Sequence, residues 1–166
     1  MKGVQLCLTS GVLENLIGYL IDHVRTAPAM WITADSELAS NRLGSHVIPM
    51  LQHSGLANLI QSADEGNARK SGKTERKLEW EGGGYLLPLG ANNEAKLRSV
   101  PVEWMLRDEV DGWPLTVGKD GDPIKLSADR TAAYESSSKT LDISTPTIVG
   151  QSRISELYAQ GDQRKY

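Results

Sequence analysis

The chain has 166 residues, of which 39% are hydrophobic and 23% charged, and its formal net charge is −3. This length suffices for one sizeable core and the composition does not change abruptly, so we expect a single domain over residues 1–166. The lack of a long apolar run and of a signal peptide predicts a cytoplasmic protein with no membrane span. The acidic net charge argues against a domain that holds DNA by itself. The single cysteine, Cys7, excludes an internal disulfide.

The first third of the chain indicates two helices around a strand. Apolar residues recur at steps of three and four over residues 11–26, which is the period of an amphipathic helix. A short apolar run at 29–34 predicts a buried strand. Asp35 or Ser36 can then cap a second helix, which Pro49 should kink or end.

The middle of the chain is polar at first and then strand-like. Residues 62–76 predict a solvent-exposed loop, and the runs 77–80 and 85–89 predict a hairpin with a glycine turn between them. Residues 92–99 form a turn or short helix in this interpretation. They lead to an apolar strand at 102–106.

The last third repeats the alternation of helix and strand. A loop rich in Gly, Pro and Asp covers 113–123, a helix 124–134 and a strand 139–144, and Ser152 can cap a last helix that extends through residue 159. Strands that alternate with helices predict an α/β fold, with a mostly parallel sheet flanked by helices on both faces.

Asp108 and Glu109 directly follow the predicted strand 102–106. Magnesium-dependent nucleotide hydrolysis needs such a pair, because the aspartate can hold the ion while the next carboxylate orients an attacking water. A surface turn after a core strand explains the same residues equally well. Arg107 weakens the functional interpretation slightly, since it interrupts the apolar run.

Two segments compete as a phosphate-binding loop. Ser71-Gly-Lys-Thr74 has five residues between Gly66 and Gly72 where the P-loop pattern requires four, and it lacks a preceding hydrophobic strand, so we interpret it as a basic loop. The segment from Lys2 to Thr9 leads directly into the first helix, whose starting amides would face an anion. Without further context, a lysine and a threonine near an N-terminus, such as Lys2 and Thr9, more often belong to ordinary solvated surface.

Four stretches of the sequence occur together in a specific order. They are residues 1–5 with 15–23, residues 83–99, the run Asp108-Glu-Val-Asp111, and residues 143–154 with 162–164. In these stretches the chain resembles, nearly end to end, the ATPase region of the large terminase subunits of tailed phages, of the GpA type. The resemblance implies a P-loop NTPase-like sheet that lacks its first strand, with ATP and Mg²⁺ as cofactors.

The resemblance also implies roles for individual residues. The nucleotide would be bound by Lys2, Gly3, Gln5 and Thr9, with the lysine at the front of a deviant loop. Asp108 would be the Walker B residue that binds Mg²⁺ together with Thr9, and Glu109 the catalytic carboxylate. Ser144, Thr145 and Pro146 would couple hydrolysis to DNA movement. Arg98, Arg130 and Arg153 are equal candidates for the arginine that completes such a site.

The implied role is packaging of double-stranded viral DNA into a capsid, in the host cytoplasm, with a small terminase subunit, a portal and further copies of the chain as partners. Cys7 and Leu8 depart from the pattern, because the loop usually has small, glycine-like residues there. The strand expected before Met1 and the nuclease domain expected after Tyr166 are not in the sequence. A truncated prophage remnant, or a non-catalytic interaction module that keeps the fold, is therefore the second interpretation.

Overall fold

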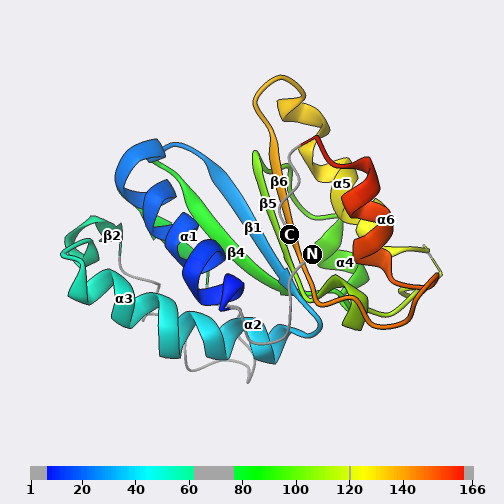
Figure 1. The fold of residues 1–166 in the computed structure, drawn as a ribbon. Coiled ribbons are helices and arrows are strands. Elements are labelled where there is room, and N and C mark those ends of the chain that lie inside the picture. Colours follow the sequence, from blue (N-terminus) through cyan, green and yellow to red (C-terminus); the bar gives the residue numbers. More distant parts are fainter. Residues whose placement is uncertain (1–6, 62–76, 120, 163–166) are drawn as a thin grey trace.

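A six-stranded sheet forms the centre of the protein in the computed structural model, which describes residues 7–61, 77–119 and 121–162. Its strands are β1 (Pro28–Thr33), β2 (Ile60–Gln61), β3 (Leu78–Trp80), β4 (Tyr85–Gly90), β5 (Trp104–Asp108) and β6 (Lys139–Ile143). They lie in the order β2-β3-β4-β1-β5-β6 (Figure 1). The neighbouring strands β4, β1, β5 and β6 are parallel to one another. β3 is antiparallel to both of its neighbours, β2 and β4. The predicted mostly parallel sheet is confirmed.

The helical segments follow the predicted periodicity. They are η1 (Thr9–Glu14), α1 (Asn15–Tyr19), η2 (Leu20–Val24), α2 (Ser36–Arg42), η3 (Leu43–Val47), α3 (Ile48–His53), η4 (Ala57–Leu59), α4 (Glu94–Leu97), η6 (Val110–Gly112), α5 (Pro123–Ala128), η7 (Asp129–Tyr134) and α6 (Arg153–Gln160). η1, α1 and η2 follow one another without a break where the first amphipathic helix was predicted. Asp35 and Ser152 cap α2 and α6 with their side chains, as expected. No helix in these ranges is long and apolar enough to cross a membrane.

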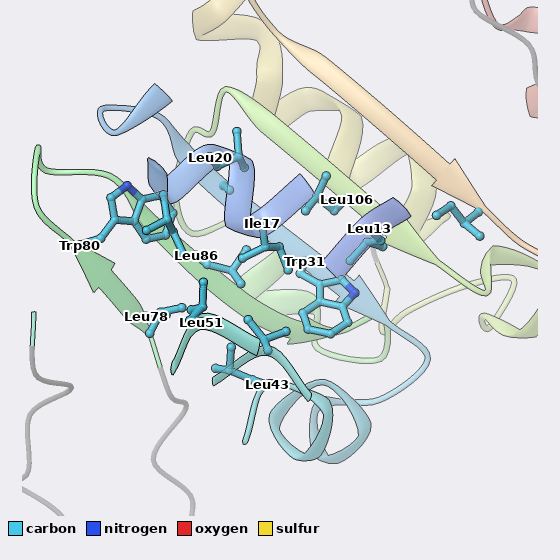
Figure 2. Close-up of a cluster of buried hydrophobic side chains, with 14 residues drawn as sticks. Leu13, Ile17, Leu20, Trp31, Leu43, Leu51, Leu78, Trp80, Leu86 and Leu106 are labelled. Carbon is cyan, nitrogen blue, oxygen red and sulfur yellow. The ribbon is translucent and has the colours of Figure 1, made fainter. Parts of the chain in front are cut away.

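Helices cover both faces of the sheet. The segments from η1 to η2 and from α2 to α3 pack on one face, and α4, α5 and α6 pack on the other (Figure 1). Along β1, Ala29 and Trp31 belong to one hydrophobic cluster and Met30 and Ile32 to the other, because successive side chains of a strand point to opposite faces. Figure 2 shows the first cluster around Trp31. Burial on both faces explains why this strand is apolar throughout.

The glycine-containing turn of the predicted hairpin packs tightly on the end of the first helical segment. The carbonyl of Arg25 accepts hydrogen bonds from the Gly84 amide at 2.9 Å and from the Trp80 indole at 2.9 Å. A Cβ atom at Gly84 would lie 2.4 Å from both the Arg25 oxygen and Trp80 Nε1. Glycine at position 84 therefore allows this close approach.

Several details differ from the prediction. Of the two outcomes predicted at Pro49, a kink or an end of the helix, the end is wrong, because the second helical segment continues to His53. The hydrogen bonding widens to a π-helical turn in η3, and Pro49 then lies in the first turn of α3, where the missing N–H costs little. The short strand β2 was not predicted, and β5 continues to Asp108. The predicted loop at 62–76 lies outside the described residues.

A groove of about 540 Å³ extends along β6 on the side away from β5. The strand itself, from Lys139 to Ile143, forms one boundary. Leu8, directly before η1, and Val12 of η1 line the groove on one face of the sheet, and α6 contributes apolar side chains from the opposite face. Within the described ranges, β6 pairs with β5 alone, so its outer edge faces this groove.

Candidate functional site

The predicted carboxylate pair lies where β5 ends. Asp108 is the last residue of the strand and is only 3% exposed, whereas Glu109 is half-buried. The carboxyl ends of β1, β5 and β6 meet at the same edge of the sheet, because these strands are parallel. The Glu109 amide donates a 2.7 Å hydrogen bond to the Ile143 carbonyl, which joins the pair to the end of β6. This edge is where open α/β sheets bind ligands.

Thr9 meets Asp108 across 99 positions of the sequence. The Thr9 hydroxyl, at the start of η1, donates a buried 3.1 Å hydrogen bond to Asp108 Oδ1. Asp108 points to the same face of β5 as Leu106, which packs in the cluster that includes Leu13 and Ile17 of the first helical segment. The packing of this segment on the sheet therefore brings Thr9 to Asp108. The two residues predicted as magnesium ligands are in direct contact.

The donor set at this point fits a magnesium ion held with few protein ligands. A hydroxyl and a carboxylate are oxygen donors, and Mg²⁺ usually takes one or two protein carboxylates together with waters and phosphate oxygens. Among the described residues, no group of three or more His, Cys, Asp or Glu side chains could hold a metal. The fit is therefore to an ion shared with a phosphate ligand and not to a cage made of protein alone.

The turn after Asp108 has a strained start and a closed hydrogen-bond pattern. Glu109 adopts the left-handed conformation, with φ 54° and ψ 47°, which is costly for a residue that is not glycine. Its carbonyl accepts a 2.9 Å hydrogen bond from the Gly112 amide, and Trp113 Nε1 donates to the Asp108 carbonyl at 2.9 Å. No signal in the sequence indicates this role of Trp113. These contacts define the orientation in which the chain leaves the strand.

Ser144 lies directly after β6 and is fully buried, next to this turn. Its Oγ accepts a 3.1 Å hydrogen bond from the Asp111 amide. Thr145 is half-buried and Pro146 is exposed. The structure therefore places the first residue of the predicted coupling motif, Ser144, beside the carboxylate turn.

Asp111 joins the same turn to the chain that follows β6. Partial burial by itself raises the pKa of Asp111, but hydrogen bonds from the Ile154 amide, from the side chain of Ser152 and from Thr147 lower it, and the net pKa lies below its ordinary value. The carboxylate is thus stabilised in its charged form. In the sequence Asp111 stands out only as part of a motif, because its partners are distant along the chain.

Arg107 belongs to the other face of the sheet and supports β5. Its Nη2 donates to Asp142 Oδ2 at 2.9 Å, its Nε donates to Oδ1 of the same carboxylate, and its Nη1 donates to the Ile124 carbonyl at 3.0 Å. These bonds join β5 to β6 and to α5. The interruption of the apolar run by Arg107 is therefore structural and does not count against the adjacent carboxylate pair.

The three candidate arginines differ in their positions. The Arg130 carbonyl accepts from the Val102 amide and its guanidinium donates to the Arg98 carbonyl, so both lie toward the start of β5, away from Asp108. Arg153 begins α6, where its guanidinium pairs with Asp122 and with the Pro114 carbonyl. Of the three, Arg153 lies in the element that contacts the carboxylate turn.

The front of the predicted phosphate loop is described only from Cys7 onward, so Lys2, Gly3 and Gln5 lie outside the described residues, as does the segment Ser71–Thr74. Cys7 is exposed and adopts the left-handed conformation with φ 53°. Leu8 packs against the cluster around Trp31. Position 7 therefore has the backbone conformation that favours glycine, although the residue there is a cysteine.

Comparisons with known proteins agree with this fold. The family model described as "Phage terminase large subunit gpA, ATPase domain" matches residues 1–166. A solved structure, the "Thermus Phage P74-26 Large Terminase ATPase domain", is similar with a TM-score of 0.53 at 12% identity, over 87% of this chain and 59% of that chain. At this identity the likeness concerns the fold, and this chain spans less than two thirds of that one. No curated protein matches.

Proposed function

Because the chain belongs to the phage terminase large subunit gpA ATPase domain family, we propose that it is the ATPase motor domain that powers packaging of double-stranded viral DNA into a capsid. The contact between Thr9 and Asp108 is the observation that carries this proposal. It brings the end of the predicted phosphate loop onto the end of β5, beside Glu109. A phosphate-binding loop facing an acidic pair is what phosphoryl transfer requires.

In this proposal Asp108 and Thr9 would hold Mg²⁺, which would supply positive charge to offset that of the nucleotide phosphates. Glu109 accepts a proton from the attacking water and orients it. The buried position of Asp108 holds its carboxylate in one place, so the chain contributes mainly positioning and charge. Lys2, Gly3 and Gln5 contact the phosphates, by resemblance to the family.

The acidic balance of the chain bears on the DNA partner. A net charge of −3 does not favour a domain that neutralises many phosphates alone. We propose that DNA is engaged by several copies arranged together, with the portal and a small terminase subunit as further partners, as the family implies. Ser144, Thr145 and Pro146 would pass the effect of hydrolysis toward the DNA.

Two measurements test this proposal. ATP hydrolysis by the purified chain is measured as phosphate release, and MgATP binding is measured by calorimetry. We expect Glu109→Gln to lower kcat at least about a hundredfold, as loss of a general base does, while MgATP binding is retained. Asp108→Ala should remove the magnesium dependence of binding. Glu135→Gln changes an exposed glutamate and serves as the matched control. Absence of nucleotide binding by the folded wild-type chain would refute the proposal.

A second candidate is a module that keeps the fold without ATP turnover. One observation favours it: Cys7 adds a side chain to a left-handed backbone position, in the loop that is predicted to approach the phosphates. The same experiment separates the candidates. Hydrolysis that depends on Glu109 excludes the module, whereas a folded chain that binds no MgATP supports it.

A further inference from the structure

One carboxylate, that of Asp111, contacts two segments that follow β6. Its Oδ2 accepts hydrogen bonds from the amide and the hydroxyl of Thr147, both at 3.0 Å. Its Oδ1 accepts from the Ile154 amide, in the first turn of α6, at 2.7 Å. Together with the bond from its own amide to Ser144 Oγ, Asp111 joins η6 to the predicted coupling motif and to α6.

The other end of this connection is the carboxylate pair. Asp111 lies within the turn closed by the bonds from Gly112 to the Glu109 carbonyl and from Trp113 to the Asp108 carbonyl. Trp113 is 4% exposed and Val110 is fully buried, so the turn is anchored in the core. A shift of the pair relative to the sheet therefore has to move Asp111 with it.

The segment that Asp111 contacts has few other attachments. Residues 146–151 are all exposed, including the apolar residues Ile148 and Val149, whose relative exposures are 59% and 101%. Apolar packing therefore contributes little to the position of this segment. The hydrogen bonds to Asp111 are its main tie to the carboxylate turn within the described residues.

We propose that Asp111 is a positioning residue that couples the Asp108–Glu109 turn to residues 144–154, so that a change at the pair is passed to the segment holding the predicted coupling motif. The catalytic consequence of this link rests on the proposed function, but the link itself does not. Asparagine at position 111 offers one acceptor oxygen in place of two, so it can serve Thr147 or Ile154 but not both.

The first experiment requires no nucleotide. Amide hydrogen exchange and chemical shifts of Thr147 and Ile154 are measured by NMR in the full chain, with and without Asp108→Asn. We expect Asp108→Asn to change both amides in the wild-type background, and to leave them unchanged when Asp111→Ala is also present. A response that persists with Asp111→Ala, or none in the wild-type background, overturns the proposal. Should Asp111→Ala fail to fold, Asp111→Asn replaces it and should reduce the response at one of the two amides.

The second experiment measures ATP hydrolysis by Asp111→Asn, with Asp129→Asn, an exposed aspartate in η7, as the matched control. A coupling residue should lower kcat about tenfold and change KM less than about twofold. Equal loss in the control, or a changed KM with an unchanged kcat, contradicts the coupling role. If the wild-type chain binds no MgATP, the proposed function fails, while the NMR experiment still decides whether the link exists.

Discussion

Arg107→Met should destabilise the protein far more than loss of an ordinary ion pair. The side chains of Arg107 and Asp142 are 5% and 20% exposed, and the guanidinium also satisfies the Ile124 carbonyl. Methionine fills much of the space but donates no hydrogen bond. The variant therefore leaves a largely buried carboxylate and a carbonyl without these donors.

The magnitude follows from this burial. Removing one partner of a buried ion pair costs about 3–5 kcal/mol. The Asp142 side chain keeps some contact with water, which screens the charge that remains, so we expect a loss at the lower end, about 3 kcal/mol. That is a large part of the roughly 5–15 kcal/mol by which a domain is stable.

Urea unfolding followed by circular dichroism measures this loss. The matched control is Lys77→Met, because Lys77 pairs with Glu79 while both side chains are more than 40% exposed (43% and 49%), and its cost should stay below about 1 kcal/mol. Replacing both residues, as Arg107→Met with Asp142→Leu, should recover part of the stability, since no unpaired charge remains. A cost of Arg107→Met no greater than that of Lys77→Met would show that the buried pair does not stabilise the fold in this way.

Three further predictions concern other parts of the fold. Gly84→Ala should cost at least about 2 kcal/mol in urea unfolding, because the added Cβ would overlap the Arg25 carbonyl, whereas Gly11→Ala, with open space in a helical segment, should be stabilising by about 0.5–1 kcal/mol; equal effects would contradict this. Because the pKa of Asp111 is lowered in the folded state, this carboxylate stabilises the fold fully above its unfolded pKa of about 4, and the stabilisation is lost as pH falls through the folded pKa. Asp111→Asn should therefore flatten this part of the profile of unfolding free energy against pH, and an unchanged profile would contradict this prediction. Trp31→Phe should cost less than about 2 kcal/mol by thermal unfolding, since within the described chain the buried Trp31 indole N–H has no hydrogen-bond partner, and a larger loss would show that the indole ring is needed there.

Much of the fold was predictable because local signals and burial agree. The apolar period of three and four marks the first helical segment, and the uninterrupted apolar run of β1 reflects burial on both faces. Caps at Asp35 and Ser152 could be identified because their oxygens bond to amides only three residues ahead. Such signals are short-range, so one sequence contains them in full.

The remaining features depend on contacts between distant residues. β2 has only two residues and exists because it pairs with β3, so it leaves no period to detect. The helix continues past Pro49 because the preceding turn widens, an adjustment that the proline rule does not include.

The site shows the same division. Asp108 and Glu109 were predicted from their place after a strand, but their contacts were not. Arg107 looked like an interruption because its partner, Asp142, is 35 residues away and on another strand. The role of Asp111 was equally hidden, because it bonds to Thr147 and Ile154. Roles that depend on hydrogen bonds between residues far apart in the sequence could not be predicted from one sequence.

The left-handed backbone at Glu109 sets stability against the proposed catalytic role of this residue. A residue with a Cβ pays about 1–2 kcal/mol there, whereas glycine adopts the conformation freely. A designer who optimised the sequence for folding alone would therefore choose glycine at this position, and would gain a more stable protein without the second carboxylate. In protein engineering, Glu109→Gly would be selected as a stabilising substitution, although it removes the carboxylate for which the catalytic role is proposed.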